Sequence, residues 1–410
     1  MAPPLRTPAA IAGAALVGGL LWFWLWDATP PEEAIPMDSH SHARPNEVRV
    51  RHVSLDLELD FQKQEIRGQA SLRLERRVPT ADLILDTQNL EILGVTGADG
   101  GERQFRWGQD DPILGQALVI GLSNNDDAVT VRYRTRPDAA ALQWLDPSQT
   151  SGKLPFLYTQ GQAILTRTWI PLQDTPGVRV TYDATVRAPA NMRVLMSAPE
   201  SERRDDNSYR FHMPHAIPSY LIALACGDID RREISDRCAV HAEPAVVESA
   251  AVELADMGRM LQACEKAFGP YRWGRYDVLI LPPAFPFGGM ENPTLTFATP
   301  TILAGDKSLV ALIAHELAHS WSGNLVTNAT WRDFWLNEGF TVYLEQRIME
   351  IVYGRERAKM EILLGLRGLE EELKRLPPRD QVLHVDLTNR DPDAGMTLVP
   401  YQKGAAFLRR

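Results

Sequence analysis

The most constraining feature of the sequence is an alternation of apolar and polar residues that begins near residue 47. Apolar side chains at Val53, Leu55, Leu57, Leu59 and Phe61 alternate with polar ones. A period of two residues places the apolar set on one face of a β-strand, so that this face is buried. Further strand-like segments follow at 66–74, 82–86, 129–134, 178–186, 193–197, 209–213 and 220–225. Residues 46–235 are therefore predicted to form one all-β domain.

The spacing of apolar residues becomes helical after residue 243. Apolar side chains recur every three or four positions between Val247 and Phe268, which is typical of an amphipathic helix. Asp306 is a candidate N-cap for a second helix, whose apolar positions span 309–317. We expect a short strand over 276–281 and further helices over 331–351 and 356–375. Residues 236–410 are therefore predicted to form an α+β domain.

Residues 1–45 differ from both predicted domains. The segment Ala9–Trp26 is apolar and uncharged, with Arg6 before it and tryptophans at its end. As a helix it would span about 27 Å, close to the hydrocarbon thickness of a bilayer. The charge distribution predicts a membrane anchor with the body of the protein exported, periplasmic or extracellular. A protein secreted after signal-peptide cleavage is the alternative. Residues 29–45 are predicted to be a proline-rich linker.

Charge and cysteine content exclude two classes of function. The formal net charge of −10 argues against a nucleic-acid-binding protein, which would carry a basic surface. The three cysteines, Cys226, Cys238 and Cys264, contain no C-x-x-C pair, which excludes a cysteine metal site. Cys226 and Cys238 could form a disulfide in an exported protein. The alternative is that all three are buried, apolar side chains.

The predicted 309–317 helix contains an H-E-x-x-H motif. His315 and His319 are four positions apart, so they lie on one helix face and can bind one metal ion, with Glu316 beside its water. Glu338 follows His319 after eighteen residues, on the next predicted helix, with a turn at 323–328 between them. Two histidines and one glutamate leave a fourth position open, as in catalytic zinc sites. Two structural histidines on a core helix are the alternative.

These residues predict zinc-assisted amide hydrolysis, with one Zn²⁺ per chain and Glu316 as the general base. A second segment, Gly288–Asn292, indicates which kind of peptide bond is cleaved. Its paired glycines allow another backbone to approach, so the segment could bind an extended peptide as a sheet edge. A carboxylate at Glu291 would favour a free α-ammonium and hence an aminopeptidase over an endopeptidase. A solvated turn residue is the alternative for Glu291.

Three motifs together resemble the aminopeptidase N family of zinc metallopeptidases, the gluzincins. They are G-G-M-E-N at 288–292, H-E-L-A-H-S-W at 315–321 and W-L-N-E-G-F at 335–340. The segments Y-T-Q-G-Q-A at 158–163 and P-F-G-G-M-E-N-P-T-L from Pro286 resemble the branch that contains leukotriene A-four hydrolase and aminopeptidase B. The resemblance implies a saddle-like β domain over 46–235 and a thermolysin-like catalytic domain over 236–410.

The resemblance also implies roles for single residues. Tyr401 matches the tyrosine that stabilises the oxyanion, and Asp393 matches an acid in the pocket for the first substrate residue. A preference for basic N-terminal residues follows from Asp393. Glu291 is implied to bind the substrate amine together with Gln162 and Gln160, while the backbone of Gly288, Gly289 and Met290 holds the substrate strand. The implied partners are peptides with a free N-terminus.

Two departures from the family pattern bear on the alternative functions. Met396 occupies the position of a second tyrosine that the leukotriene branch ties to epoxide chemistry, which disfavours a bifunctional lipid epoxide hydrolase. The chain also ends at Arg410, inside a helix expected near Pro400, whereas the family continues into a C-terminal helical domain. We therefore expect a truncated catalytic domain without that helical domain. An inactive zinc-binding scaffold is the alternative to an active aminopeptidase.

Overall fold

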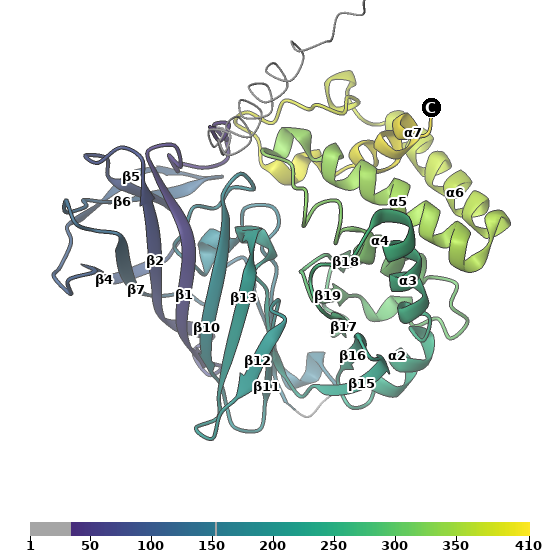
Figure 1. Ribbon diagram of the computed structural model, residues 1–410, viewed down its shortest axis with the longest axis horizontal. Helices are drawn as coiled ribbons and strands as arrows, with labels where there is room; N and C mark the ends of the chain where they lie inside the picture. The colour runs from purple at the N-terminus through teal and green to yellow at the C-terminus, as the bar shows by residue number, and fades with distance from the viewer. Residues whose placement is uncertain (1–33, 152–153) are drawn as a thin grey trace, which may run out of the picture. The chain divides into compact units, whose positions relative to one another are not determined.

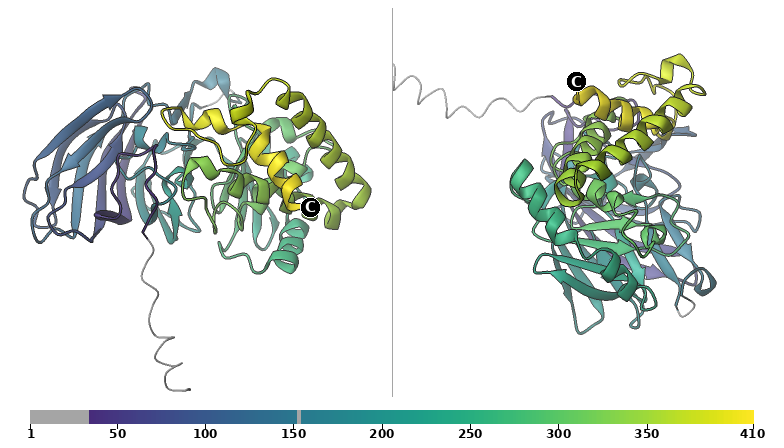
Figure 2. Two further views of the ribbon diagram at one scale, coloured as in Figure 1. Left: turned by 90° about the horizontal axis from the view of Figure 1, so that it is seen from above. Right: turned by 90° about the vertical axis from the view of Figure 1, so that its right-hand side faces the viewer.

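The structure is a computed structural model that describes residues 34–151 and 154–410. Residues Pro36–Arg410 form one unit, in which a part rich in β-strands and a part rich in helices lie side by side (Figures 1 and 2). The predicted membrane segment Ala9–Trp26 lies outside the described residues and stays a prediction. Within the described ranges, no helix is both long enough and apolar enough to cross a bilayer.

The alternating segment forms β1, which lies near the middle of a seven-stranded sheet. Leu55, Leu57 and Leu59 are buried, and the polar residues between them are more exposed, as the alternation predicted. β1 pairs with β2 in antiparallel and with β10 in parallel orientation. The strand order is β12-β13-β10-β1-β2-β7-β4. The strands are β1 (Val48–Asp60), β2 (Glu65–Arg76), β4 (Glu91–Gly97), β7 (Ala128–Arg134), β10 (Arg179–Arg187), β12 (Glu200–Arg203) and β13 (Ser208–Pro218).

Two smaller sheets complete the N-terminal β part. One has the order β3-β6-β5 and the other β11-β14-β9-β8. Their strands are β3 (Leu83–Thr87), β5 (Phe105–Asp111), β6 (Gly115–Ile120), β8 (Leu142–Leu145), β9 (Phe156–Thr159), β11 (Arg193–Met196) and β14 (Leu224–Gly227). The predicted strand over 220–225 is correct only at its end, because Ser219–Leu221 is a 3-10 turn and β14 begins at Leu224. The N–H of Ala223 donates to the Ser197 hydroxyl instead of to a neighbouring strand.

A fourth sheet supports the helices and has the order β15-β16-β17-β19-β18. Its strands are β15 (Asp230–Ser235), β16 (Cys238–Ala242), β17 (Tyr276–Ile280), β18 (Gly289–Met290) and β19 (Leu295–Ala298). β15 and β16 form a hairpin within this sheet, so the expected domain boundary at residue 235 falls inside that hairpin. We propose a boundary between Gly227 and Asp230, where the chain passes from one sheet to the next.

The helices agree with the sequence pattern except at two places. They are α2 (Val247–Glu253), α3 (Met257–Phe268), α4 (Ala311–Ala318), α5 (Trp335–Tyr353), α6 (Arg355–Leu373) and α7 (Gly404–Leu408), with a π-helical turn over Val399–Lys403 before α7. The single helix expected over 247–268 is broken, and acids on either side of the break bind Lys307. Glu253 accepts from the backbone N–H of Lys307 at 2.8 Å, and Asp256 accepts from the Lys307 ammonium group at 2.9 Å.

The expected N-cap at Asp306 is also wrong. Its carboxylate accepts from the N–H of Ser308 and closes a local turn, and α4 begins only at Ala311. Short polar side chains often make such local backbone bonds in preference to capping a helix. The three cysteines are free and buried, which agrees with the alternative stated for them.

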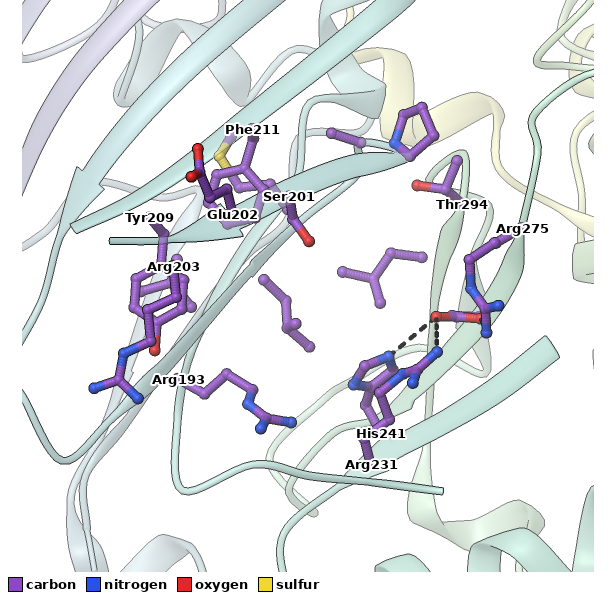
Figure 3. A pocket seen from close by; sticks show the side chains of 17 residues that line it. Arg193, Ser201, Glu202, Arg203, Tyr209, Phe211, Arg231, His241, Arg275 and Thr294 are labelled. Carbon is purple, nitrogen blue, oxygen red and sulfur yellow. Dashed lines mark hydrogen bonds and ion pairs between the residues drawn. The ribbon is translucent and has the colours of Figure 1, made fainter. Parts of the chain in front are cut away.

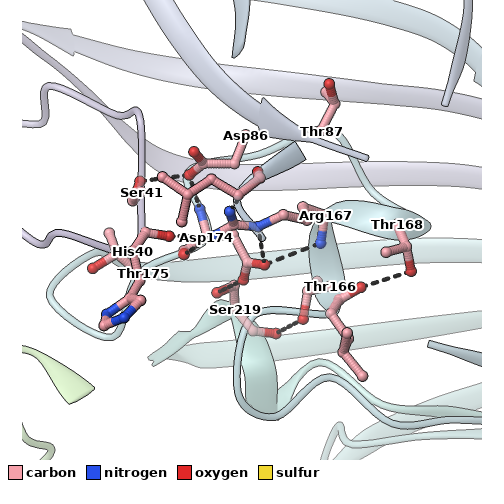
Figure 4. A network of polar contacts seen from close by, with 12 residues as sticks. His40, Ser41, Asp86, Thr87, Thr166, Arg167, Thr168, Asp174, Thr175 and Ser219 are labelled. Carbon is pink, nitrogen blue, oxygen red and sulfur yellow. Dashed lines mark hydrogen bonds and ion pairs between the residues drawn. The ribbon is translucent and has the colours of Figure 1, made fainter. Parts of the chain in front are cut away.

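A buried polar network joins the segment that precedes β1 to the β part (Figure 4). Arg167 is fully buried, pairs with Asp174 at 3.1 Å and donates to the backbone oxygen of His40 at 2.7 Å. Asp86 accepts from Ser41 Oγ at 2.5 Å and from the N–H of Asp174 at 2.8 Å. Asp174 is paired with Arg167, and Asp86 accepts hydrogen bonds from Ser41 and from the N–H groups of His42 and Asp174. Pairing and hydrogen bonding are the conditions under which buried ions are tolerated.

The same N-terminal segment also contacts the helical part. His40 Nε2 lies 3.1 Å from the backbone oxygen of Leu387 and 3.0 Å from that of Arg390. The Leu387–Arg390 segment leads into the turn Pro392–Gly395, which contains Asp393. Residues 38–42 therefore hold this loop against the β part.

Candidate active site

Helices α4 and α5 bring three predicted ligands together. His315 Nε2 and His319 Nε2 are 3.1 Å apart, and Glu338 Oε2 lies 3.3 Å from the first and 3.6 Å from the second. Two atoms that each bind a tetrahedral zinc ion at about 2.1 Å are separated by about 3.4 Å. Glu338 Oε2 is buried without a hydrogen-bond donor, as expected of an atom reserved for a cation. The three side chains therefore fit a zinc ion.

The outer nitrogen of each histidine has an acceptor that fixes its tautomer. His315 Nδ1 lies 3.0 Å from Glu345 Oε2, and His319 Nδ1 lies 3.1 Å from the backbone oxygen of Ser322. A proton on each Nδ1 leaves both Nε2 lone pairs free to bind metal. Gly323, with φ of 108°, begins the turn that returns the chain towards α5. This turn lies in the segment 323–328 that the sequence predicted.

The candidate base lies against the glycine segment. Glu316 is buried, and its Oε2 has no hydrogen-bond partner. A Cβ atom added to Gly289 would lie 2.5 Å from Glu316 Cδ, so only glycine leaves room for this carboxylate. Burial raises the pKa of Glu316 above its ordinary value. A divalent cation between the three ligands would oppose that shift.

Glu291 is buried, which excludes the solvated turn residue considered above. Its carboxylate accepts from Gln162 Nε2 at 3.3 Å, and its backbone oxygen accepts from Asn324 Nδ2 at 2.7 Å. Burial raises the pKa of Glu291 to about 7. Unlike Gln162, Gln160 directs its Nε2 to Met290 Sδ, at 3.1 Å. Its Oε1 is buried without a partner.

Tyr401 approaches the ligands from the turn before α7. Its ring stacks on His315 with centroids 6.2 Å apart and packs edge-on against Phe334 at 5.9 Å. Burial and then the carboxylates of Glu338 and Glu291 raise the pKa of Tyr401 well above its ordinary value. A phenol that keeps its proton can donate a hydrogen bond to a developing negative charge.

Eleven of the twelve predicted site residues line one cavity of about 690 Å³. Met290 is the exception, since it lies behind the cavity wall and contacts Gln160. β18 forms the edge of its sheet, which agrees with the predicted edge at Gly288–Asn292. Asp393 and Met396 line the cavity from the loop that His40 holds.

The cavity also contains acids that the sequence analysis missed. Glu345 and Glu361 join Glu291, Glu316, Glu338 and Asp393 in its lining, and no lysine or arginine is among the described residues that line it. Glu345 lies seven positions after Glu338, two turns along the same helix face, and that spacing could have identified it. Glu361 pairs with Arg357 at 3.1 Å and had no comparable signal.

Comparison with known proteins agrees with these features. Residues 49–221 match the peptidase M1 N-terminal domain, and residues 252–410 match the peptidase family M1 domain. The chain is 42% identical to leukotriene A-4 hydrolase of Xenopus laevis, with 90% of this chain and 63% of that protein aligned. It is 40% identical to leucine aminopeptidase 2 of Yarrowia lipolytica, over 92% of this chain and 60% of that protein.

Solved structures show the same relation. Yeast LTA4 hydrolase in complex with bestatin matches with a TM-score of 0.88 at 38% identity, over 92% of this chain and 61% of that one. An M1 zinc metallopeptidase from Deinococcus radiodurans, at 22% identity and a TM-score of 0.71, shares the fold. The chain spans about three fifths of the length of the two curated relatives and of yeast LTA4 hydrolase. The two family matches confirm the predicted β domain and thermolysin-like domain. The chain belongs to peptidase family M1, in the branch related to leukotriene A-4 hydrolase and leucine aminopeptidase.

Proposed function

We propose that this chain is a zinc-dependent aminopeptidase that removes N-terminal amino acids from peptides and holds one zinc ion. The observation that carries the proposal is the position of Glu291. Its carboxylate and ligand atoms of Glu316 and His319 lie within 4.8 Å of one another. A buried carboxylate beside the reacting groups would bind the free α-ammonium of a substrate. An internal peptide segment offers no such cation, so the carboxylate would be left without a partner.

The residues divide the chemistry among them. A zinc ion held by His315, His319 and Glu338 would supply a Lewis acid that polarises the scissile carbonyl and the attacking water. Glu316 would remove the proton of the attacking water and deliver it to the leaving amine. Tyr401 would donate a hydrogen bond to the carbonyl oxygen as negative charge develops on it.

The edge strand would position the substrate. β18 pairs with β19 on one side, and as the edge strand it is available for an extended peptide on its other side. Backbone hydrogen bonds from Gly288 to Met290 would fix the peptide in register. The carboxylate-rich lining favours cationic substrates, so we propose a preference for arginine or lysine at the N-terminus, with Asp393 facing that side chain.

There are two alternatives to an active aminopeptidase. A lipid epoxide hydrolase is disfavoured because Met396, which lines the cavity, has no proton to donate. An inactive zinc-binding scaffold is the competing proposal. We also propose that the body of the protein is exported and anchored by residues 9–26, or secreted after their cleavage.

The test is a panel of aminoacyl-amide substrates assayed with and without a zinc chelator, each substrate paired with its N-acetylated form. An aminopeptidase hydrolyses the substrates with a free amine, loses activity on chelation and does not hydrolyse the acetylated forms. Equal rates on both forms would refute the role of Glu291. Stoichiometric zinc binding without turnover would instead support the scaffold.

A further inference from the structure

A second cavity, of about 400 Å³, shares no lining residue with the candidate active site. Residues of β11, β12 and β13 line one side of it, and residues of β15, β16 and β17 line the other (Figure 3). Its volume lies within the range of sites that bind small molecules, which is about 300–1,000 Å³. The proposed aminopeptidase reaction makes no use of this cavity.

The lining of this second cavity is basic. Four arginines and one histidine face two carboxylates, those of Glu202 and Asp277. The basic residues are Arg193, Arg203, Arg231, Arg275 and His241. A local excess of positive charge is unexpected on a chain whose formal net charge is −10. Such a concentration of one sign of charge in a cavity attracts ligands of the opposite sign.

Glu233, which lies outside the lining, pairs with Arg231 and, at 2.9 Å, with Arg275. The carboxylate of Asp277 takes three further donors. It accepts from the N–H of Ala239 at 2.9 Å, from His241 Nε2 at 3.2 Å and from Arg275 at 3.2 Å. His241 is 5% exposed, yet its Nδ1 has no hydrogen-bond partner, and neither has the buried Nε of Arg275. Buried polar atoms without partners are rare in native proteins and call for an explanation such as an absent ligand.

Arg193 supplies a free cation. Its side chain makes no hydrogen bond or ion pair with any residue in the described part of the chain. Figure 3 shows it extending from the opposite wall towards His241 and Arg231. Donors on both sides of the cavity therefore converge on one region.

We propose that this second cavity binds a small phosphate-bearing molecule. The forked guanidinium group of Arg193 matches the geometry of phosphate oxygens. On the other wall, Arg275 Nε and His241 Nδ1 are buried polar atoms without a partner that such a ligand could contact. Phosphate provides acceptors in several directions, as donors on opposite walls require. Met196, Phe211 and Leu295 also line the cavity and would contact an uncharged organic part of the ligand.

The experiment is isothermal titration calorimetry of inorganic phosphate into the full, zinc-loaded chain and into two variants. Arg193→Gln removes the free guanidinium at an exposed position, so the variant should fold. Arg210→Gln is the matched control, because Arg210 is an exposed residue between Tyr209 and Phe211 of β13 and is absent from the lining. Side chains alternate along a strand, so Arg210 faces away from the cavity.

We expect saturable binding to the unaltered chain, at least about tenfold weaker binding to Arg193→Gln and no more than about twofold change in Arg210→Gln. Aminoacyl-amide hydrolysis should be the same in all three proteins, so this test is independent of the proposed function. Absence of saturable binding would overturn the proposal. Equal weakening in both variants would also overturn it, because phosphate would then respond to overall charge. Loss of binding in a third variant, Glu338→Gln, which lacks a predicted metal ligand, would overturn it as well, because phosphate would then bind at the metal.

Discussion

Replacement of Gly289 by alanine tests whether the position of the Glu316 carboxylate controls catalysis. Gly289 lies in β18 and pairs with Ala298 of β19 in antiparallel register. It does not require a positive φ, so alanine should be tolerated by the backbone. The added Cβ would lie 2.5 Å from Glu316 Cδ and 2.7 Å from its Cγ.

These distances set the size of the expected effect. Carbon atoms in contact are normally about 3.5–4.0 Å apart, so the carboxylate must move by about 1 Å. A displacement of about 1 Å in an active site can reduce the rate about 10²-fold, or about 2.7 kcal/mol of activation free energy. We therefore expect Gly289→Ala to lower kcat about 10²-fold while zinc content is unchanged, because the three metal ligands do not move.

Gly288→Ala is the control for this prediction. Its added Cβ would meet only Leu312, with Cδ1 at 3.1 Å, at the end of a flexible side chain. Steady-state hydrolysis of an aminoacyl amide and measurement of bound zinc compare the two variants. If Gly289→Ala retains kcat within about threefold of Gly288→Ala, Glu316 is not the base or its position is not critical.

Three further predictions concern residues around the cavity. Tyr401→Phe should lower kcat about 10²–10³-fold with little change in KM, and an unaltered kcat would exclude the oxyanion role. Glu345→Gln should weaken zinc binding about 10–100-fold in chelator competition, because His315 loses the negatively charged acceptor that orients it; unchanged affinity would contradict this. The protein around Asp393 displaces water and raises the pKa of its carboxyl to about 6, with Asp391 adding to the shift. A carboxyl with a raised pKa is neutral below that pH, so the rate ratio of arginyl over leucyl amide should rise between about pH 5 and pH 7. The ratio should be flat in Asp393→Asn, and a pH dependence that survives the substitution would assign the titration elsewhere.

The zinc ligands were predictable because most of their geometry is local. His315 and His319 are one helical turn apart, so their spacing alone places them on one face. Glu338 required only that the next helix pack against the first. Glu345, the acceptor for His315, follows Glu338 by seven positions on α5, and it could have been predicted from that spacing. Glu361 lies on α6 and lines the cavity through helix packing that no short motif encodes.

The strands that were missed lack the pattern on which strand prediction depends. Every residue of β16 and β19 is buried, so an alternation of apolar and polar residues is absent. β18 consists of only Gly289 and Met290. The buried state of Glu291 could not be read from the sequence either, because its carboxylate is enclosed by Gln162 and other residues that are distant along the chain.

The most direct measurement is a zinc titration of the metal-free chain, with bound zinc and hydrolysis of arginyl amide followed together. We expect activity to rise in proportion to bound zinc and to reach a plateau at one zinc ion per chain. Glu338→Gln should bind zinc weakly, and Glu316→Gln should bind it fully without activity. Activity that does not depend on zinc, or that persists in Glu316→Gln, would contradict the assignment of His315, His319, Glu338 and Glu316 to the catalytic centre.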